Sequence, residues 1–262
     1  MAAILMFGAC KKTKKTDGAV APFTVEQKQN VAYMYFGGTW CGPCGAYGKP
    51  TKQGLHENAT NANAVFISFQ VKWSYSDPFA TQTTDATAAN FGVTGVPTAY
   101  IAGGTTFTKT GFFTSNAANI SGQQTTMNGV YSQTALVNGK VTPSLAGNAL
   151  TVKSQNKFFS ASSDTFYVQS YVTESNLTAT QYQDGSTKLN IHDFIWRAQS
   201  GSNFYGDLLV IAPTAGQVVE KNLNIVLQDI FQKGNCDVNV IIWHKKGGKF
   251  GIENCYKSKM QL

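Results

Sequence analysis

The stretch VAYMYFGGTWCGPCGAYG, residues 31–48, decides the kind of fold to expect. Residues 31–36 form a continuous run of apolar and aromatic side chains ended by two glycines, which is typical of a strand buried on both faces. Cys41 and Cys44 follow at once, separated by Gly42 and Pro43. Proline suits the first turn of a helix, where its missing N–H costs nothing. The stretch therefore predicts a buried strand, a cysteine pair and a helix, in that order.

The flanking sequence extends this pattern into an α/β domain over residues 20–139. We expect a second buried strand at 63–71, a helix ending near residue 92, two strands within 97–114 and a polar helix over 116–136. After residue 138 the chain changes to short alternating runs separated by Gly, Asn and Ser. Six such runs predict an all-β antiparallel sandwich domain over residues 140–262.

Two motifs of the first half resemble the thioredoxin superfamily. The run WCGPC, residues 40–44, is the thioredoxin active-site sequence, and TGVPT, residues 94–98, is similar to the loop that carries the family's cis-proline. The resemblance implies a thioredoxin-like domain in which Cys41 is the exposed nucleophile and Cys44 the resolving thiol. A helix amino terminus carries partial positive charge, so it lowers the pKa of a thiol placed there.

The same resemblance assigns roles to residues around the two cysteines. Trp40 would form one wall of the site. Gly42 and Pro43 would help to set the reduction potential of the cysteine pair. Val96, held by a cis Pro97, would pair its backbone with an extended substrate segment. The sequence departs from the family at one point, because Tyr35 stands where a buried acid is usual.

The amino-terminal sequence MAAILMFGACKKTKKTDG predicts a lipid anchor. A short apolar run leads through small residues to Cys10, as in a bacterial lipobox, and a polar Lys- and Thr-rich segment follows. We interpret residues 1–19 as a signal remnant and tether, with a lipid on Cys10 holding the protein in the bacterial cell envelope, at the outer membrane. The alternative is a frayed tail with a free thiol.

Composition and charge agree with an envelope protein and exclude a nucleic-acid reader. Charged residues make up 13% of the chain, against about 25% in a typical soluble protein. The net charge of +7 comes from two lysine clusters, one near each end, and Arg197 is the sole arginine. A nucleic-acid site needs many basic contacts on one face, so we expect no such partner.

The remaining cysteines and histidines indicate no metal site and no bound cofactor. A structural zinc site would need a second close pair of ligands, whereas Cys236, Cys255, His192 and His244 are scattered over the second half. A structural disulfide between Cys236 and Cys255 is left open, because a tight turn at residues 247–248 would place Cys255 opposite another residue.

A second, weaker resemblance concerns the arrangement of the whole chain. A thioredoxin-like domain, a lipobox and a β-sandwich with a His192…Arg197 segment are similar to a family of two-domain outer-membrane lipoproteins. The sequence thus favours an envelope-anchored thiol–disulfide oxidoreductase that acts on protein thiols and disulfides and draws electrons from an unidentified donor. The alternative is a non-catalytic binding or structural lipoprotein that uses the thioredoxin-like unit as a scaffold.

Overall fold

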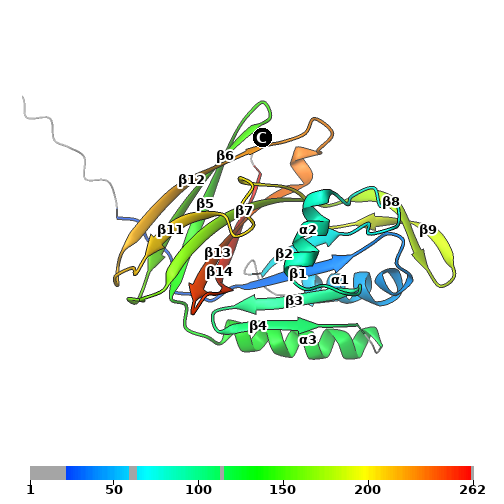
Figure 1. The fold of residues 1–262 in the computed structure, drawn as a ribbon, viewed down its shortest axis with the longest axis horizontal. Helices are drawn as coiled ribbons and strands as arrows, with labels where there is room; N and C mark the ends of the chain where they lie inside the picture. The colour runs from blue at the N-terminus through cyan, green and yellow to red at the C-terminus, as the bar shows by residue number, and fades with distance from the viewer. Residues whose placement is uncertain (1–21, 59–63, 113–114, 261–262) are drawn as a thin grey trace, which may run out of the picture.

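The computed structural model describes residues 22–58, 64–112 and 115–260, and these residues are mostly β. Strands account for 47% of them and helices for 19%. The described helices are α1 (Lys49–Asn58), α2 (Gln82–Asn90) and α3 (Asn116–Tyr131), together with the short helical turns η1 (Cys44–Gly48) and η2 (Lys233–Asn235). Figure 1 shows the three longer helices gathered at one end and a long-stranded β region at the other.

A mixed sheet of nine strands runs through the molecule. In spatial order its strands are β14 (Lys249–Lys259), β13 (Cys236–Lys246), β7 (Thr165–Glu174), β10 (Ile195–Gln199), β2 (Ala64–Gln70), β1 (Val31–Gly37), β3 (Thr98–Gly103) and β4 (Thr106–Thr110), while β11 (Asp207–Ile211) pairs with β7. The two halves of the chain meet where β10 lies parallel to β2. There Ile195 is opposite Ser68, and the Ser68 N–H donates to the Phe194 carbonyl at 2.7 Å.

The fold class predicted from the sequence, an α/β thioredoxin-like domain followed by an all-β sandwich, is therefore wrong. The structure is mostly β, and strands from both halves of the chain share one sheet. The prediction failed at β10, which was not recognised as a strand. Local alternation identifies a strand from its own side chains, whereas β10 is a five-residue segment whose place depends on partners far away in the sequence.

Strand β1 is buried on both faces, as its sequence predicted. Tyr33 and Tyr35 point into the core beneath α1 and α3, whereas Met34 and Phe36 point to the opposite core, which contains Ala88 of α2. None of these five side chains is more than 3% exposed. The continuous apolar run at 31–36 is thus explained by helices packed on both sides of the strand.

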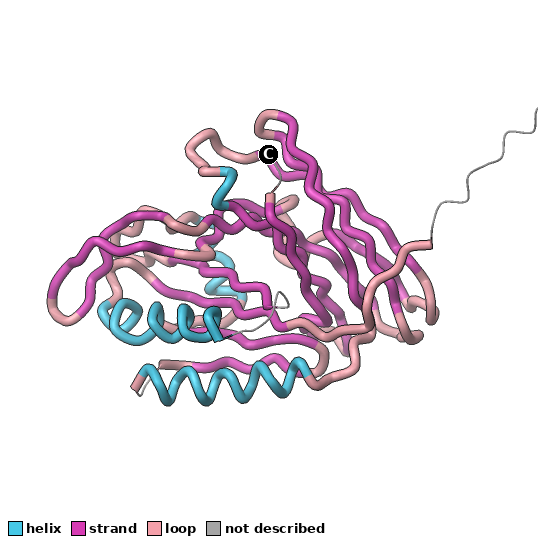
Figure 2. Tube along the Cα trace, turned by 180° about the vertical axis from the view of Figure 1, so that it is seen from behind, coloured by secondary structure: helices cyan, strands magenta, loops and turns pink. Residues whose placement is uncertain are grey.

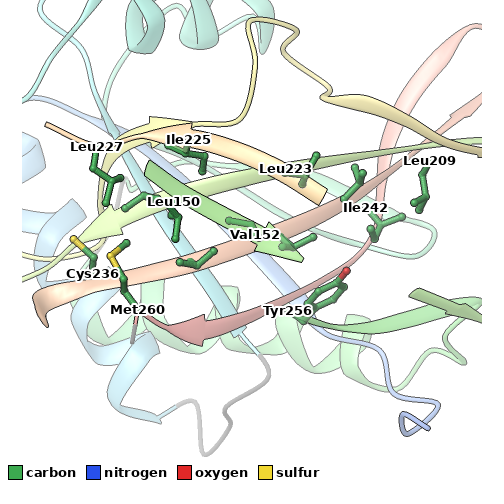
Figure 3. Packing of buried hydrophobic residues seen from close by; sticks show 14 of the residues in the cluster. Leu150, Val152, Leu209, Leu223, Ile225, Leu227, Cys236, Ile242, Tyr256 and Met260 are labelled. Carbon is green, nitrogen blue, oxygen red and sulfur yellow. The ribbon is translucent and has the colours of Figure 1, made fainter. Parts of the chain in front are cut away.

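A second sheet packs against β7, β13 and β14 of the main sheet. It consists of β5 (Val137–Ala146), β6 (Ala149–Phe158) and β12 (Val218–Val226), in the order β12-β6-β5. Figure 3 shows Leu150 and Val152 of β6 with Leu223 and Ile225 of β12 in the same core as Ile242 of β13. Alternate residues of β6 are buried, as expected for a strand with one face on a core.

Two further strands in the middle of the chain form a hairpin that projects away from this core. They are β8 (Leu177–Gln183) and β9 (Ser186–His192), joined by a tight turn at Asp184 and Gly185, which both have positive φ. Figures 1 and 2 show the hairpin extending over the end of the molecule that carries the helices.

A buried polar cluster ties the start of β1 to β5 and β14. The Asn254 side chain, fully buried, accepts from the backbone N–H of Asn30 at 2.9 Å and donates to the carbonyls of Val137 at 2.6 Å and Lys28 at 3.0 Å. The Asn30 amide in turn donates to the Cys255 carbonyl at 2.6 Å. Because buried backbone groups left without partners are costly, this cluster fixes how the three segments meet.

Replacing Asn254 with Ala should destabilise the protein by about 2–3 kcal/mol, since it leaves several buried backbone groups without their partner. Urea unfolding followed by circular dichroism measures the change. Asn222→Ala, at an exposed position of β12, is the matched control and should stay within about 0.5 kcal/mol of the parent. Equal stability of the two variants would contradict a structural role for the cluster.

Candidate functional site

The predicted cysteine pair forms a disulfide at the start of a helix. Cys41 and Cys44 are bonded, with their Cα atoms 5.2 Å apart. The Cys41 carbonyl accepts from the N–H groups of Cys44 at 3.1 Å and Gly45 at 3.2 Å, so helical turns begin after a short turn that follows β1 and lead through η1 into α1. Pro43 lies exposed in this first turn, where no N–H is needed.

The loop that carries Pro97 lies against the Cys41 sulfur. The Val96–Pro97 peptide bond is cis, as the resemblance implied, and the Val96 carbonyl oxygen lies 3.6 Å from Cys41 Sγ. The backbone N–H of Cys44 points at the same sulfur from 3.1 Å. A thiolate on Cys41 would therefore accept a hydrogen bond from the helix amino terminus, which lowers the pKa of a thiol.

A cluster of aromatic rings stands beside the disulfide. The Trp40 indole N–H donates to the Val71 carbonyl at 2.8 Å, and the ring stacks on Tyr75 with centroids 4.3 Å apart. The centroid of the Trp73 ring lies 5.8 Å from that of the Trp40 ring. Tyr75 is 59% exposed and Trp73 41%, so these rings form part of the surface next to the site.

A groove of about 450 Å³ adjoins the disulfide on the side of the Pro97 loop. Its walls come from Pro43 and Tyr47 on one side and from residues 94–98, Lys109 and Phe112 on the other. Tyr47 is 40% exposed. The groove thus brings the predicted substrate-binding residues Pro43, Val96 and Pro97 to one surface.

The hairpin β8–β9 covers the other side of the disulfide. The Gln181 side-chain amide donates to the carbonyls of Gly38 at 3.2 Å and Cys41 at 3.0 Å, and the Tyr182 N–H donates to the Thr39 carbonyl at 2.7 Å. Cys41 is only 4% exposed and Cys44 2%. Both sulfurs are therefore much less accessible than the expectation of an exposed nucleophile implied.

Sequence reasoning missed this covering hairpin. An Asp-Gly pair between alternating runs is a strong hairpin signal, and Asp184-Gly185 stands between two such runs. No local signal shows that the hairpin packs on residues 38–45, more than a hundred positions earlier.

The buried acid that the resemblance would place in β1 is replaced by a neutral phenol. Tyr35 is 3% exposed, and burial raises the pKa of its hydroxyl well above the ordinary value. The Lys52 ammonium lies 5.2 Å from the Tyr35 ring centroid. Tyr35 therefore stays protonated at neutral pH and does not supply a carboxylate to the resolving cysteine.

Cys236 and Cys255 are both free, so the structural disulfide left open by the sequence is not formed. The register places Cys255 opposite Ile241 and Cys236 opposite Glu174 on the other side of β13. Both thiols are buried, and burial raises the pKa of each to about 12. They stay protonated in the cores of the protein.

The His192…Arg197 segment separates into two unrelated environments. Arg197 pairs with the buried Glu174 at 3.0 Å and lies over the Phe231 ring. His192 is buried beside Phe79, and burial, followed by the charges of nearby lysines, lowers its pKa to about 4. The segment thus contributes to the structure of β10 and the hairpin at separate points.

Cys10 and the tether of residues 1–19 lie outside the described residues. Among the helices that the structure describes, none has the length and apolar character needed to cross a membrane. In the same part of the chain, no three His, Cys, Asp or Glu side chains are grouped so as to hold a metal ion.

Comparison with known proteins identifies similar folds but no family. No family model matches the chain, and no curated protein matches it in sequence. Among solved structures, HBP35 of Porphyromonas gingivalis superposes with a TM-score of 0.67 at 16% identity, covering 90% of this chain and 77% of that one. Protein AGR_C_4864 of Agrobacterium tumefaciens superposes with a TM-score of 0.52 at 14% identity, covering 91% and 99%. These likenesses concern the fold alone and are consistent with a fold of two domains.

The closeness of the hairpin can be tested with two glycines of the same motif. A Cβ added at Gly45 would lie 2.8 Å from the Tyr182 carbonyl and 2.7 Å from Gln183 Cβ, whereas one at Gly42 would meet only the Tyr182 ring at 3.4 Å. Gly45→Ala should therefore push β8 outward, speed reduction of the disulfide by dithiothreitol several-fold and speed hydrogen exchange of the Tyr182 amide. Gly42→Ala should leave hydrogen exchange of the Tyr182 amide near that of the parent, although its place between the two cysteines makes it unsuitable as a control for the reduction rate. Gly129→Ala, at an exposed position of α3 where an added Cβ meets nothing within 4 Å, is the control for both rates. Equal rates in Gly45→Ala and Gly129→Ala would mean that the hairpin does not limit access to the sulfurs.

Proposed function

We propose that this protein is a thiol–disulfide oxidoreductase that exchanges disulfides with protein substrates through Cys41 and Cys44. The observation that carries the proposal is the position of the Cys41 sulfur between the Val96 carbonyl and the Cys44 N–H, next to a groove that Pro43 and Val96 line. The identity of residues 40–44 with the thioredoxin active-site sequence supports the same chemistry. Beyond this reaction, we propose attachment to the bacterial envelope through a lipid on Cys10.

The groove suits an extended peptide as substrate. In such a complex the backbone of Val96 would hydrogen-bond the peptide alongside Cys41, in the manner of a strand added to an edge. The exposed rings of Trp73 and Tyr75 beside Trp40, and the Tyr47 ring in the groove, offer apolar surface to such a peptide. The chemistry therefore selects a flexible or exposed segment of a protein rather than a small thiol alone.

The reaction needs two cysteines that act one after the other. In the reduced protein the Cys41 thiolate attacks one sulfur of a substrate disulfide, which forms a mixed disulfide and releases the other substrate sulfur as a thiolate that takes up a proton. The Cys44 thiol then loses its proton and attacks Cys41 Sγ, which restores the Cys41–Cys44 disulfide and releases the second substrate thiol. An external dithiol must return the two electrons, and with a dithiol substrate the same steps run in reverse.

Burial of both sulfurs favours a second candidate function. A disulfide covered by β8–β9 and only 2–4% exposed resembles a fixed structural bridge, and the protein would then act as a binding or structural component. A glutathione redox titration distinguishes the candidates, because a static bridge shows no reversible transition in the native protein. A potential near −270 mV would indicate a reductase, and one between about −180 and −120 mV an oxidant or isomerase.

Single cysteine variants provide the direct test. Cys44→Ser should accumulate mixed disulfides with envelope proteins, because Cys41 attacks but is not released, whereas Cys41→Ser should accumulate none. Non-reducing electrophoresis and mass spectrometry identify the adducts and the cysteine involved. Cys255→Ser, which removes a buried thiol of the core, is the control and should behave as the parent. Absence of adducts from a folded Cys44→Ser variant would contradict the oxidoreductase and leave the binding function.

A further inference from the structure

A second cavity, of about 610 Å³, opens beside α1 and contains none of the residues of the disulfide site. It lies between α1, the turn at Asp193 and Phe194 that precedes β10, and the ends of β13 and β14 where Asp237 and Lys257 stand. Its volume is within the range of sites that hold small organic molecules. Neither the sequence motifs nor the proposed exchange reaction uses it.

Lys52 forms the base of this cavity. Its side chain is only 5% exposed, and its ammonium group donates to Ser68 Oγ at 2.6 Å and to the Asp193 carbonyl at 2.8 Å. The same group lies 5.7 Å from the centroid of the Phe194 ring. A lysine held this deep, with neutral oxygens as its hydrogen-bond partners, bears its charge at a desolvation cost that the nearby Asp193 carboxylate offsets only in part.

Further lysines stand around Lys52. Lys49 and Lys257 line the cavity, and burial lowers the pKa of both. Three carboxylates also line the cavity: Glu57, Asp237, which pairs with Lys259 at 2.8 Å, and Asp193, whose Oδ1 accepts from the backbone N–H of Asn176 at 2.9 Å. The charge of Asp193 favours the ammonium forms of Lys49 and Lys52. With Lys259 counted, four lysines line the cavity against these three carboxylates, so one positive charge is in excess when all are ionised.

An apolar surface adjoins this charge. The rings of His56 and Phe194 lie 4.6 Å apart on the wall of the cavity, and both are close to Phe66 in the core beneath. Burial, followed by the charge of Lys257, lowers the pKa of His56, so the imidazole is neutral at neutral pH. The cavity therefore combines ammonium groups with a wall formed by two aromatic rings that are tilted by 52° to one another.

We propose that this cavity binds a small organic anion whose phosphate or carboxylate group contacts Lys52, Lys49 and Lys257 and whose apolar part packs on Phe194 and His56. The anion would give Lys52 a directly hydrogen-bonded negative partner, and the rings would remove its apolar part from water. The site is independent of the proposed oxidoreductase activity.

Binding should be coupled to uptake of a proton. Burial lowers the pKa of Lys52 to about 7, helped by Lys49 and opposed by Asp193, so much of this side chain is neutral at pH 7.5 in the free protein. An anion favours the ammonium form, so it raises this pKa, binds with proton uptake and binds more weakly as the pH rises above 7. The other titratable groups that line the cavity are Lys49, His56, Glu57, Asp193, Asp237, Lys257 and Lys259, and Lys52 also acts on Tyr35 and His192 outside it.

Isothermal titration calorimetry with phenyl phosphate tests the proposal. Titrations at pH 7.5 in HEPES and in Tris, which differ in heat of ionisation, measure the protons taken up. The parent protein should bind with uptake of a fraction of a proton. Lys52→Met should weaken binding at least tenfold and abolish the uptake, and Lys257→Met at the mouth should weaken binding less and keep the uptake. Lys153→Met, which removes a lysine from an exposed ion pair of β6, is the matched control and should bind as the parent.

Inorganic phosphate and phenol separate the two halves of the ligand. Both should bind more weakly than phenyl phosphate, since each lacks one of the two contacts. Phenol binding as tightly as phenyl phosphate would reduce the site to an apolar cavity and overturn the proposal. No heat with millimolar phenyl phosphate, or equal binding by Lys52→Met and the parent, would overturn it as well. If Lys52→Met does not fold, the proposal is tested by the parent and by Lys257→Met. It is supported if the parent takes up protons on binding and Lys257→Met binds more weakly, and overturned if neither is observed.

Discussion

The hydrogen bonds of Asn254 are the constraint on which the arrangement of the molecule depends. This one buried amide joins the segment before β1, the start of β5 and the middle of β14, which lie more than a hundred residues apart from one another. Because its partners are backbone groups, it fixes chain positions rather than side chains. Strand β1, which leads to the disulfide, and strands β5 and β14 are therefore held together by the same hydrogen-bonded side chain.

The disulfide site follows from this arrangement. Strand β1 places Cys41 at the end of the main sheet, and the loop before β3 places the Val96 carbonyl next to the Cys41 sulfur. The hairpin β8–β9, from the second half of the chain, covers the disulfide. The chemistry of the site comes from the first half, whereas access to it is set by the second. The two sides of the disulfide differ as a result, with an open groove on one and backbone-to-backbone contact on the other.

The sequence predicted the parts of this structure that depend on neighbouring residues. The apolar run before Cys41 and the helical turn at Pro43 follow from local chemistry, whereas the cis-proline turn at Pro97 was expected from the resemblance of residues 94–98 to a known loop. The sequence did not predict β10, whose five residues pair with β2 from the other half, and the predicted fold class failed for that reason. It likewise did not show that Gln181 covers Cys41 or that Lys52 lies at the base of a cavity, because both depend on contacts between distant segments.

The pairing of β10 with β2 also makes the two halves of the chain depend on one another. With β10 in place, the hydrogen-bonding edge of β2 lies inside a sheet, where Ser68 has its partner. If the chain were cut near its middle, the first half would expose that edge of β2 to solvent. Exposed strand edges pair with strands of other molecules and so lead to aggregation. The two halves should therefore be synthesised and passed on as one unit, because recombination that moves either half alone would leave an unpaired strand edge that favours aggregation.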